Sequence, residues 1–285
     1  MIELVITMVV IGIVATALSP IITQFINAYD AQLRRGGLVE RAQIALNRIT
    51  REVHLALPNS IRVNAGNTAM EMIRTLDGGR YRAQDDPDTV PVELSLDEFQ
   101  ADADGIFDVL GPLNNCTAIK ASGGGVFLTM MNQQPGSGNG DAYQNLNLAV
   151  VTDCDVAVDG FSSQITFTPF GAFASYSTMR KFQIVDTPVS YICFPDAGNP
   201  ANGRIIRYHG YSIAAAQPTT DAAVDALRLG EYTHDILIDK VAACEFNVDY
   251  NVTGDGLLTV SITIQDETTN ELVRLMQQVQ VLNSS

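Results

Sequence analysis

The chain has 285 residues, a formal net charge of −15, and 46% hydrophobic against 17% charged residues. This length allows one sizeable domain or two small ones, and the high apolar fraction excludes a disordered chain. Because an acidic protein lacks the basic surface that neutralises phosphates, we expect no nucleic-acid partner.

The N-terminal stretch is apolar over an unusual length, since residues 4–27 contain no charged side chain. A helix rises ~1.5 Å per residue, so ~20 such residues cross the hydrocarbon core of a membrane. Glu3 stands directly before this stretch, and a carboxylate near hydrocarbon costs about 2 kcal/mol or more unless it is paired or reaches the interface. Glu3 is therefore either an interfacial residue of a simple anchor or a group that awaits a cationic partner.

The helical pattern continues through residues 28–57 and becomes amphipathic. Pro58 is expected to end the helix, whereas Gly36 and Gly37 weaken it by ~1 kcal/mol each and predict a bend. Pro20 removes one backbone hydrogen bond and predicts local melting. Apolar residues recur at steps of three and four and predict a stripe that packs on a folded body: Leu38, Ala42, Ala45, Leu46, Ile49, Val53 and Leu57.

Beyond residue 58, short runs of alternating apolar and polar residues predict an antiparallel β-rich body. Strands are expected at 60–63, 69–76, 80–82, 126–131, 164–167, 181–185, 189–194, 204–209, 245–250, 257–264 and 272–281. A tight turn is expected at 77–79, a hairpin around 199–203, a short helix within 214–229, and loops at 84–105 and 133–140. The predicted fold class is α+β, with a long helix, transmembrane in its first half, packed on an antiparallel β-rich domain.

The four cysteines, Cys116, Cys154, Cys193 and Cys244, form no C-x-x-C pair, which argues against zinc and thioredoxin-like sites. Outside the cytoplasm, two disulfides are the natural state. Of the three arrangements, we favour Cys116–Cys154 with Cys193–Cys244, because each link then stays within one half of the body. Free buried thiols are the alternative.

Two groups of aspartates could supply oxygen ligands to calcium: Asp102, Asp104 and Asp108, and Asp153, Asp155 and Asp159. Neither completes a twelve-residue loop with a closing glutamate, so solvated acidic loops are the favoured interpretation. We expect no cofactor and no other metal. Because no Ser-His-Asp or Cys-His arrangement can be proposed, we do not expect an enzyme.

Residues 1–5, Met-Ile-Glu-Leu-Val, resemble the N-terminus of type IV pilins and type II secretion pseudopilins, whose mature chains open Phe-Thr-Leu-Ile-Glu-Leu. The resemblance implies that Glu3 is the assembly glutamate, which pairs with the N-terminal ammonium of a neighbouring subunit. It further implies that Gly12 is a packing glycine and Pro20 the helix-breaking proline. Processing by a prepilin peptidase, with N-terminal methylation, is implied as well.

Four segments of the body, 76–82, 107–113, 182–193 and 207–211, are similar to minor pilin-like proteins of the mannose-sensitive haemagglutinin (MSHA) pilus system. The resemblance implies a pilin-like fold in which residues 1–57 form the pilin helix. Residues 1–27 would lie in the membrane or filament core and 28–57 on the body. Residues 58–285 would form a periplasmic domain that later reaches the cell surface.

The partners that this resemblance implies are the membrane, other major and minor pilins, the inner-membrane assembly platform and the prepilin peptidase. The expected function is that of a minor pilin that primes assembly or caps the filament tip. One alternative is a tip adhesin that binds a surface or glycan through loops 84–105 and 133–142. A plain membrane-anchored periplasmic domain is the other.

Overall fold

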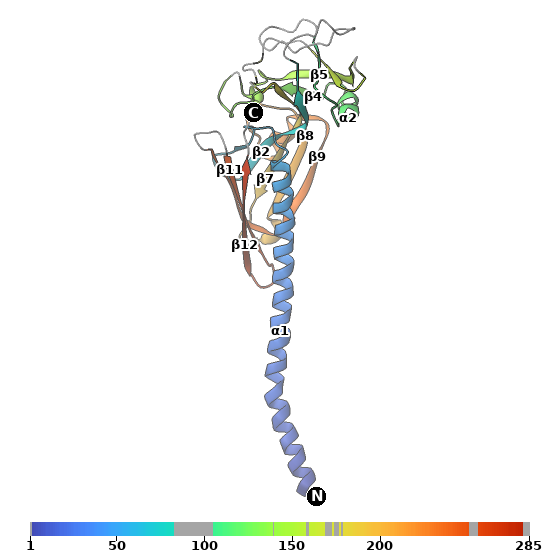
Figure 1. Ribbon diagram of the computed structural model, residues 1–285. Helices are drawn as coiled ribbons and strands as arrows, with labels where there is room; N and C mark the ends of the chain where they lie inside the picture. Colours follow the sequence, from blue (N-terminus) through green and yellow to red (C-terminus); the bar gives the residue numbers. More distant parts are fainter. Residues whose placement is uncertain are drawn as a thin grey trace.

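The computed structural model describes residues 2–82, 105–138, 140–157, 160–168, 173, 177, 179–250 and 256–281. A long N-terminal helix runs into a β-rich body, so the predicted α+β class is confirmed (Figure 1). The helices are α1 (Ile2–Val53), α2 (Cys116–Ala121) and α3 (Asp221–Asp225), with 3-10 turns η1 (Ala142–Gln144) and η2 (Pro200–Asn202). The strands are β1 (Arg62–Val63), β2 (Ala69–Arg80), β3 (Ile106–Asp108), β4 (Val126–Thr129), β5 (Ala149–Val156), β6 (Ser163–Phe167), β7 (Lys181–Phe194), β8 (Arg204–Tyr211), β9 (Arg228–Asp239), β10 (Val241–Tyr250), β11 (Gly256–Gln265) and β12 (Leu272–Val281).

The large sheet has the order β1-β2-β7-β4-β5-β6-β3, and β8 and β9 extend it from β7. Strand β7 carries both branches, because its residues 183–185 pair with β4 and its residues 189–194 pair with β8. Pro188 lies at the change between these two partners. A proline has no N–H to donate. The long strand β7 can therefore accommodate Pro188 here, between the residues that pair with β4 and those that pair with β8.

The main core lies between strands β2, β7, β8 and β9 of this sheet and a second antiparallel sheet, β10-β11-β12. The second half of α1 packs into that space and contacts β9, β11 and β12. Its buried residues within the helix are those of the predicted stripe: Leu38, Ala42, Ala45, Leu46, Ile49 and Val53. The period of three to four residues therefore identified the docked face correctly.

A second core fills the upper part of the large sheet, where β3, β4, β5 and β6 gather. Phe107 and Phe182 meet edge to face with ring centroids 5.2 Å apart, a favoured aromatic geometry. Gly79 leaves room for them, because an added Cβ would come within 3.1 Å of the Phe182 ring and 3.0 Å of Val109 and would have to displace both side chains.

The expected turn at 77–79 is wrong, since these residues continue β2 and pair with β7. The register of this pairing shifts twice around Thr75, so an irregular strand absorbs the Asp-Gly-Gly sequence that locally favours a turn. The two strands expected at 181–185 and 189–194 are one strand. Strands β3, β5 and β9 were not predicted, whereas the short helix α3 and the three C-terminal strands were.

Two expectations for α1 are also corrected. The helix ends at Val53 rather than before Pro58, because the chain turns to pair with β2: the Leu57 N–H donates to the Ile73 carbonyl over 2.8 Å. The helix is also unbroken at Pro20, where the sequence predicts local melting. It continues through Gly36 and Gly37, and the bend predicted there stays a prediction. Losing one hydrogen bond at Pro20 does not interrupt a helix whose neighbouring turns keep theirs.

Candidate functional site

The first half of α1 is a free apolar helix. Every residue from Ile2 to Asp30 is exposed, and the helix is long and apolar enough to cross a membrane. A contiguous exposed apolar surface of this size marks a membrane or protein contact. Because the helix continues without a break into the docked half, any partner of the first half is coupled mechanically to the body.

The three residues expected to act in assembly all lie on this free half. Glu3 lies in the first turn of α1, where a negative charge interacts favourably with the helix macrodipole. Glu3 and Gly12 are nine residues apart, about two and a half turns, so they face opposite sides. No atom outside the helix lies within 4 Å of a Cβ built at Gly12. The fold therefore presents Glu3, Gly12 and Pro20 outward but does not bring them together.

The threonine hydroxyl groups within this half donate hydrogen bonds to the helix itself. Thr16 donates to the carbonyls of Gly12 and Ile13 over 3.1 and 2.9 Å, in alternative bonds of one hydroxyl. Thr7 and Thr23 make equivalent bonds to carbonyls three or four residues earlier. Such internal pairing is what an apolar environment demands, because hydrocarbon supplies no hydrogen-bonding partner.

The end of α1 is fixed to the sheet by a mostly buried carboxylate. Glu52 accepts a 2.6 Å hydrogen bond from the Tyr191 hydroxyl and bonds of 2.9 and 3.0 Å from Nε of Arg207. Burial alone would raise the pKa of Glu52, but the hydrogen bonds from Tyr191 and Arg207, together with the charges of Arg207 and Arg48, outweigh burial and lower it. These three residues, which we call the helix clamp, tie α1 to β7 and β8.

Weaker ion pairs run along the docked half of α1. Arg35 pairs with Glu271 in the turn between β11 and β12, and Arg41 lies 3.3 Å from Asp239. Both arginines are more than half exposed, and exposed pairs contribute about 0–1 kcal/mol each. The helix clamp and the apolar stripe therefore dominate the attachment of the helix.

A second buried carboxylate, Glu71 on β2, organises the middle of the body. Arg62 Nε donates to it over 2.6 Å and the Tyr211 hydroxyl over 2.8 Å. The Arg62 guanidinium also donates to the carbonyls of Ala214 and Ala215 and stacks on the Tyr143 ring, 3.6 Å from its centroid. This group joins β1, β2, β8 and η1.

Glu71 predicts a specific pH dependence of stability. Burial raises the pKa of Glu71 from 4.5 to about 7. The contribution of Glu71 to the free energy of unfolding is therefore fully present below pH 4.5 and is lost as pH rises through 7. We expect the unfolding free energy of the wild type, relative to Glu71→Gln, to fall by about 3 kcal/mol between pH 4.5 and 8. Urea unfolding of the full chain in detergent across this pH range measures the difference.

The matched control is Glu52→Gln, whose difference from the wild type should stay nearly constant between pH 4.5 and 8 and shrink only at lower pH. Because the pKa of Glu52 is lowered, its contribution is present above its ordinary pKa and is lost as pH falls. A pH-independent difference between the wild type and Glu71→Gln would contradict the role given to burial of Glu71.

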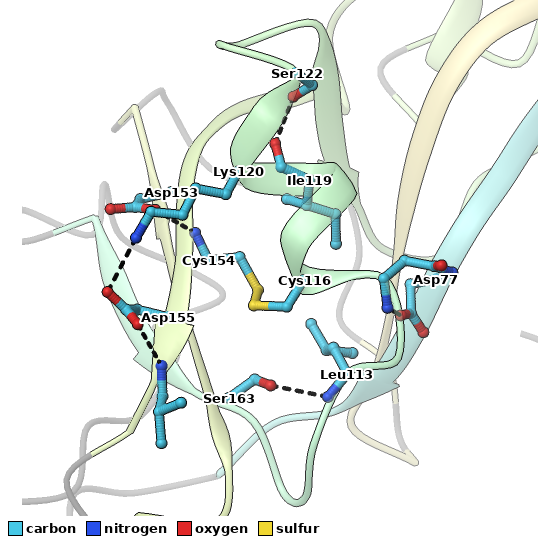
Figure 2. Close-up of a disulfide and its surroundings, with 12 residues drawn as sticks. Asp77, Leu113, Cys116, Ile119, Lys120, Ser122, Asp153, Cys154, Asp155 and Ser163 are labelled. Atoms are coloured by element: carbon cyan, nitrogen blue, oxygen red, sulfur yellow. Dashed lines mark hydrogen bonds and ion pairs between the residues drawn. A yellow bond between two sulfur atoms is a disulfide. The ribbon is translucent and has the colours of Figure 1, made fainter.

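Two disulfides link Cys116 to Cys154 and Cys193 to Cys244, the same pairs that we favoured from the sequence. Figure 2 shows the first, which joins α2 to β5. Asn115 lies just before α2. Its backbone N–H donates to the Asp77 carboxylate, and its side-chain amide donates to the Leu76 carbonyl, so these two bonds join the start of α2 to β2. Disulfides of this kind persist in oxidising compartments, which fits a body outside the cytoplasm.

The acidic groups considered for calcium do not form a cluster in the part of the chain that the structure describes. Asp153 and Asp155 flank the Lys120 ammonium, at 3.3 and 3.1 Å (Figure 2). Asp108 is buried and accepts a hydrogen bond from Gln164. Asp102, Asp104 and Asp159 lie outside the described residues. Among the described residues, no group of three or more His, Cys, Asp or Glu side chains could hold a metal ion.

The loops expected to carry adhesion are described only in part. Of 84–105, only Gly105 lies within the described residues, and 133–142 is described except for residue 139. The carboxylate of Asp141 shapes the second loop by accepting from the N–H groups of Gly136 and Tyr143, each over 2.8 Å.

Together these features define a protein whose apolar N-terminal helix has membrane-spanning length and carries a disulfide-bonded α+β body. Comparisons with protein-family models, curated proteins and solved structures found no match.

Proposed function

We propose that this protein is a minor pilin, a pseudopilin-like subunit of an MSHA-type type IV pilus that resembles the minor pilin-like protein MshO. In this proposal it waits in the inner membrane with its body in the periplasm. It then enters a filament through α1, where it primes assembly or caps the tip. It acts by binding and has no catalytic step.

The observation that carries the proposal is the exposed apolar half of α1 with Glu3 in its first turn. Packing of that half against the helices of other subunits supplies affinity through van der Waals contacts, because lipid tails are as apolar as the helix and give no hydrophobic driving force. Glu3 supplies register, because a carboxylate in an apolar filament core is stable only beside a cation. The helix clamp holds the body at a fixed angle to α1, whose N-terminal half would be buried in the filament.

Deletion of the gene tests the function. We expect cells to lose most of their surface pili, counted by electron microscopy, and to regain them when the wild-type gene is returned. Normal pilus numbers with failed attachment to surfaces would contradict priming and favour the adhesin. Normal pili and normal attachment would favour a plain membrane-anchored domain.

A further inference from the structure

After Glu3, the first charged residue of α1 is Asp30, and the first basic residues are Arg34 and Arg35, one turn further on. Between Glu3 and Arg34 there are 31 residue steps, about 46 Å along an α-helix. A bilayer including its headgroups is about 40–45 Å thick. When Glu3 lies at one headgroup layer, Arg34 and Arg35 therefore reach the outer boundary of the other layer.

Aromatic side chains mark the same boundary. Phe25 and Tyr29 are 73% and 62% exposed, and four residues of separation place them on one face of α1. Amphipathic tyrosine rings concentrate at membrane interfaces, and arginines beyond them extend toward the headgroups. The order of Phe25, Tyr29, Arg34 and Arg35 thus follows the change from hydrocarbon to headgroup.

The lowest part of the body lies at the level of these arginines. The turn between β11 and β12, residues 266–271, reaches down along α1 toward its N-terminal half (Figure 1). Arg35 pairs with Glu271 of this turn, and the charge of Arg34 acts on Asp266. The Asp266 carboxylate also accepts from the N–H groups of Thr268 and Thr269, over 2.9 and 2.8 Å, so the turn is ordered.

We propose that, in the membrane-inserted protein, the body rests on the phospholipid headgroups through a docking surface made of Arg34, Arg35 and the 266–271 turn. This inference rests on the inserted state of the proposed function. Arg34 binds lipid phosphates, and Arg35 does so through Nη1, because its Nε and Nη2 bond to Glu271. The exposed side chains of Thr268 and Thr269 meet the headgroup layer. The body is therefore held against the membrane and does not stand away from it on the helix.

The sequence contains no tryptophan, so single tryptophans can report on contact with the membrane. Thr268→Trp places a reporter in the turn. Leu146→Trp places a control reporter at an exposed site just after η1. The neighbouring residues of η1 pack against Leu57, which follows the C-terminal end of α1, so this site lies at the opposite end of the body from the turn. The full chain is reconstituted in phosphatidylcholine–phosphatidylglycerol vesicles with a fraction of lipids that carry a nitroxide on the headgroup. We expect strong quenching of the tryptophan fluorescence in the Thr268→Trp protein and only background quenching in the Leu146→Trp protein.

The arginines are tested in the Thr268→Trp protein. Each arginine near an anionic surface strengthens attraction about fivefold, so Arg34→Gln with Arg35→Gln is expected to lower the ratio of docked to undocked body about 25-fold. Arg51→Gln, an exposed arginine at the other end of α1, is the matched control and should change nothing. Raising the salt concentration should weaken docking as well.

Insertion of the helix is measured separately with Tyr29→Trp and lipids brominated on the acyl chains. If the Tyr29→Trp protein is quenched but the Thr268→Trp protein behaves like the Leu146→Trp protein, the docking surface is wrong and the proposed function stands. If the Tyr29→Trp protein is not quenched either, the membrane-inserted state fails and both proposals are contradicted. If the fluorescence of the Thr268→Trp protein is quenched equally in the arginine variants, the assignment of Arg34 and Arg35 is overturned.

Discussion

Replacement of Glu3 with leucine is expected to lower incorporation of this protein into pili by roughly 100-fold or more. In the filament that we propose, loss of Glu3 leaves the cationic partner unpaired in an apolar core, which costs about 3–5 kcal/mol. The amount of protein in the membrane should not change, because Glu3 lies on the free half of α1 and leucine is more apolar. Quantitative immunoblotting of sheared pili against whole cells measures the ratio.

Glu40→Gln is the control for this experiment, since Glu40 is an exposed carboxylate on the same helix, within its docked half. Its incorporation should equal that of the wild type. Wild-type incorporation of the Glu3→Leu protein would contradict the register role of Glu3 and leave it as an interfacial residue of an anchor.

Replacement of Arg207 with methionine is expected to destabilise the body by about 3 kcal/mol, because it removes the main cation beside the mostly buried Glu52 carboxylate. Arg207 and Glu52 are 6% and 13% exposed at their side chains, so water replaces little of the lost interaction. The double variant with Glu52→Gln should recover part of the loss. Urea unfolding of the full chain in detergent gives the free energies.

Arg48→Met provides the matched comparison. Arg48 also faces Glu52, but at 3.6 Å and with 39% of its side chain exposed, and such a pair contributes about 0–1 kcal/mol. Equal losses for Arg48→Met and Arg207→Met would contradict the assignment of the clamp to Arg207.

The parts of this fold that could be predicted are those set by a local period. The docked stripe of α1 follows from steps of three and four residues, since one helix face is buried and the other is free. Strands β10, β11 and β12 follow from alternation along a sheet with one buried face. Strand β9 escaped prediction because it is an edge strand, in which polar residues such as Thr233, His234 and Asp235 leave no clear alternation.

The polar groups that hold the body together could not be assigned from the sequence. Glu52 meets Tyr191 and Arg207 across separations of 139 and 155 residues, and no local pattern specifies such a meeting. Glu71 did carry a signal, because a charged residue within Ala-Met-Glu-Met-Ile stands in an otherwise buried run. That signal indicates a partnered carboxylate but does not identify Arg62 or Tyr211 as the partners.

The most direct test of the proposed pilin is mass spectrometry of the N-terminus of the native protein, expressed from its own upstream codons. The proposal predicts a processed chain in which an N-methylated phenylalanine and a threonine precede Met1. An unmodified Met1, in cells whose other pilins are processed, would contradict it and leave a protein that is simply anchored by α1.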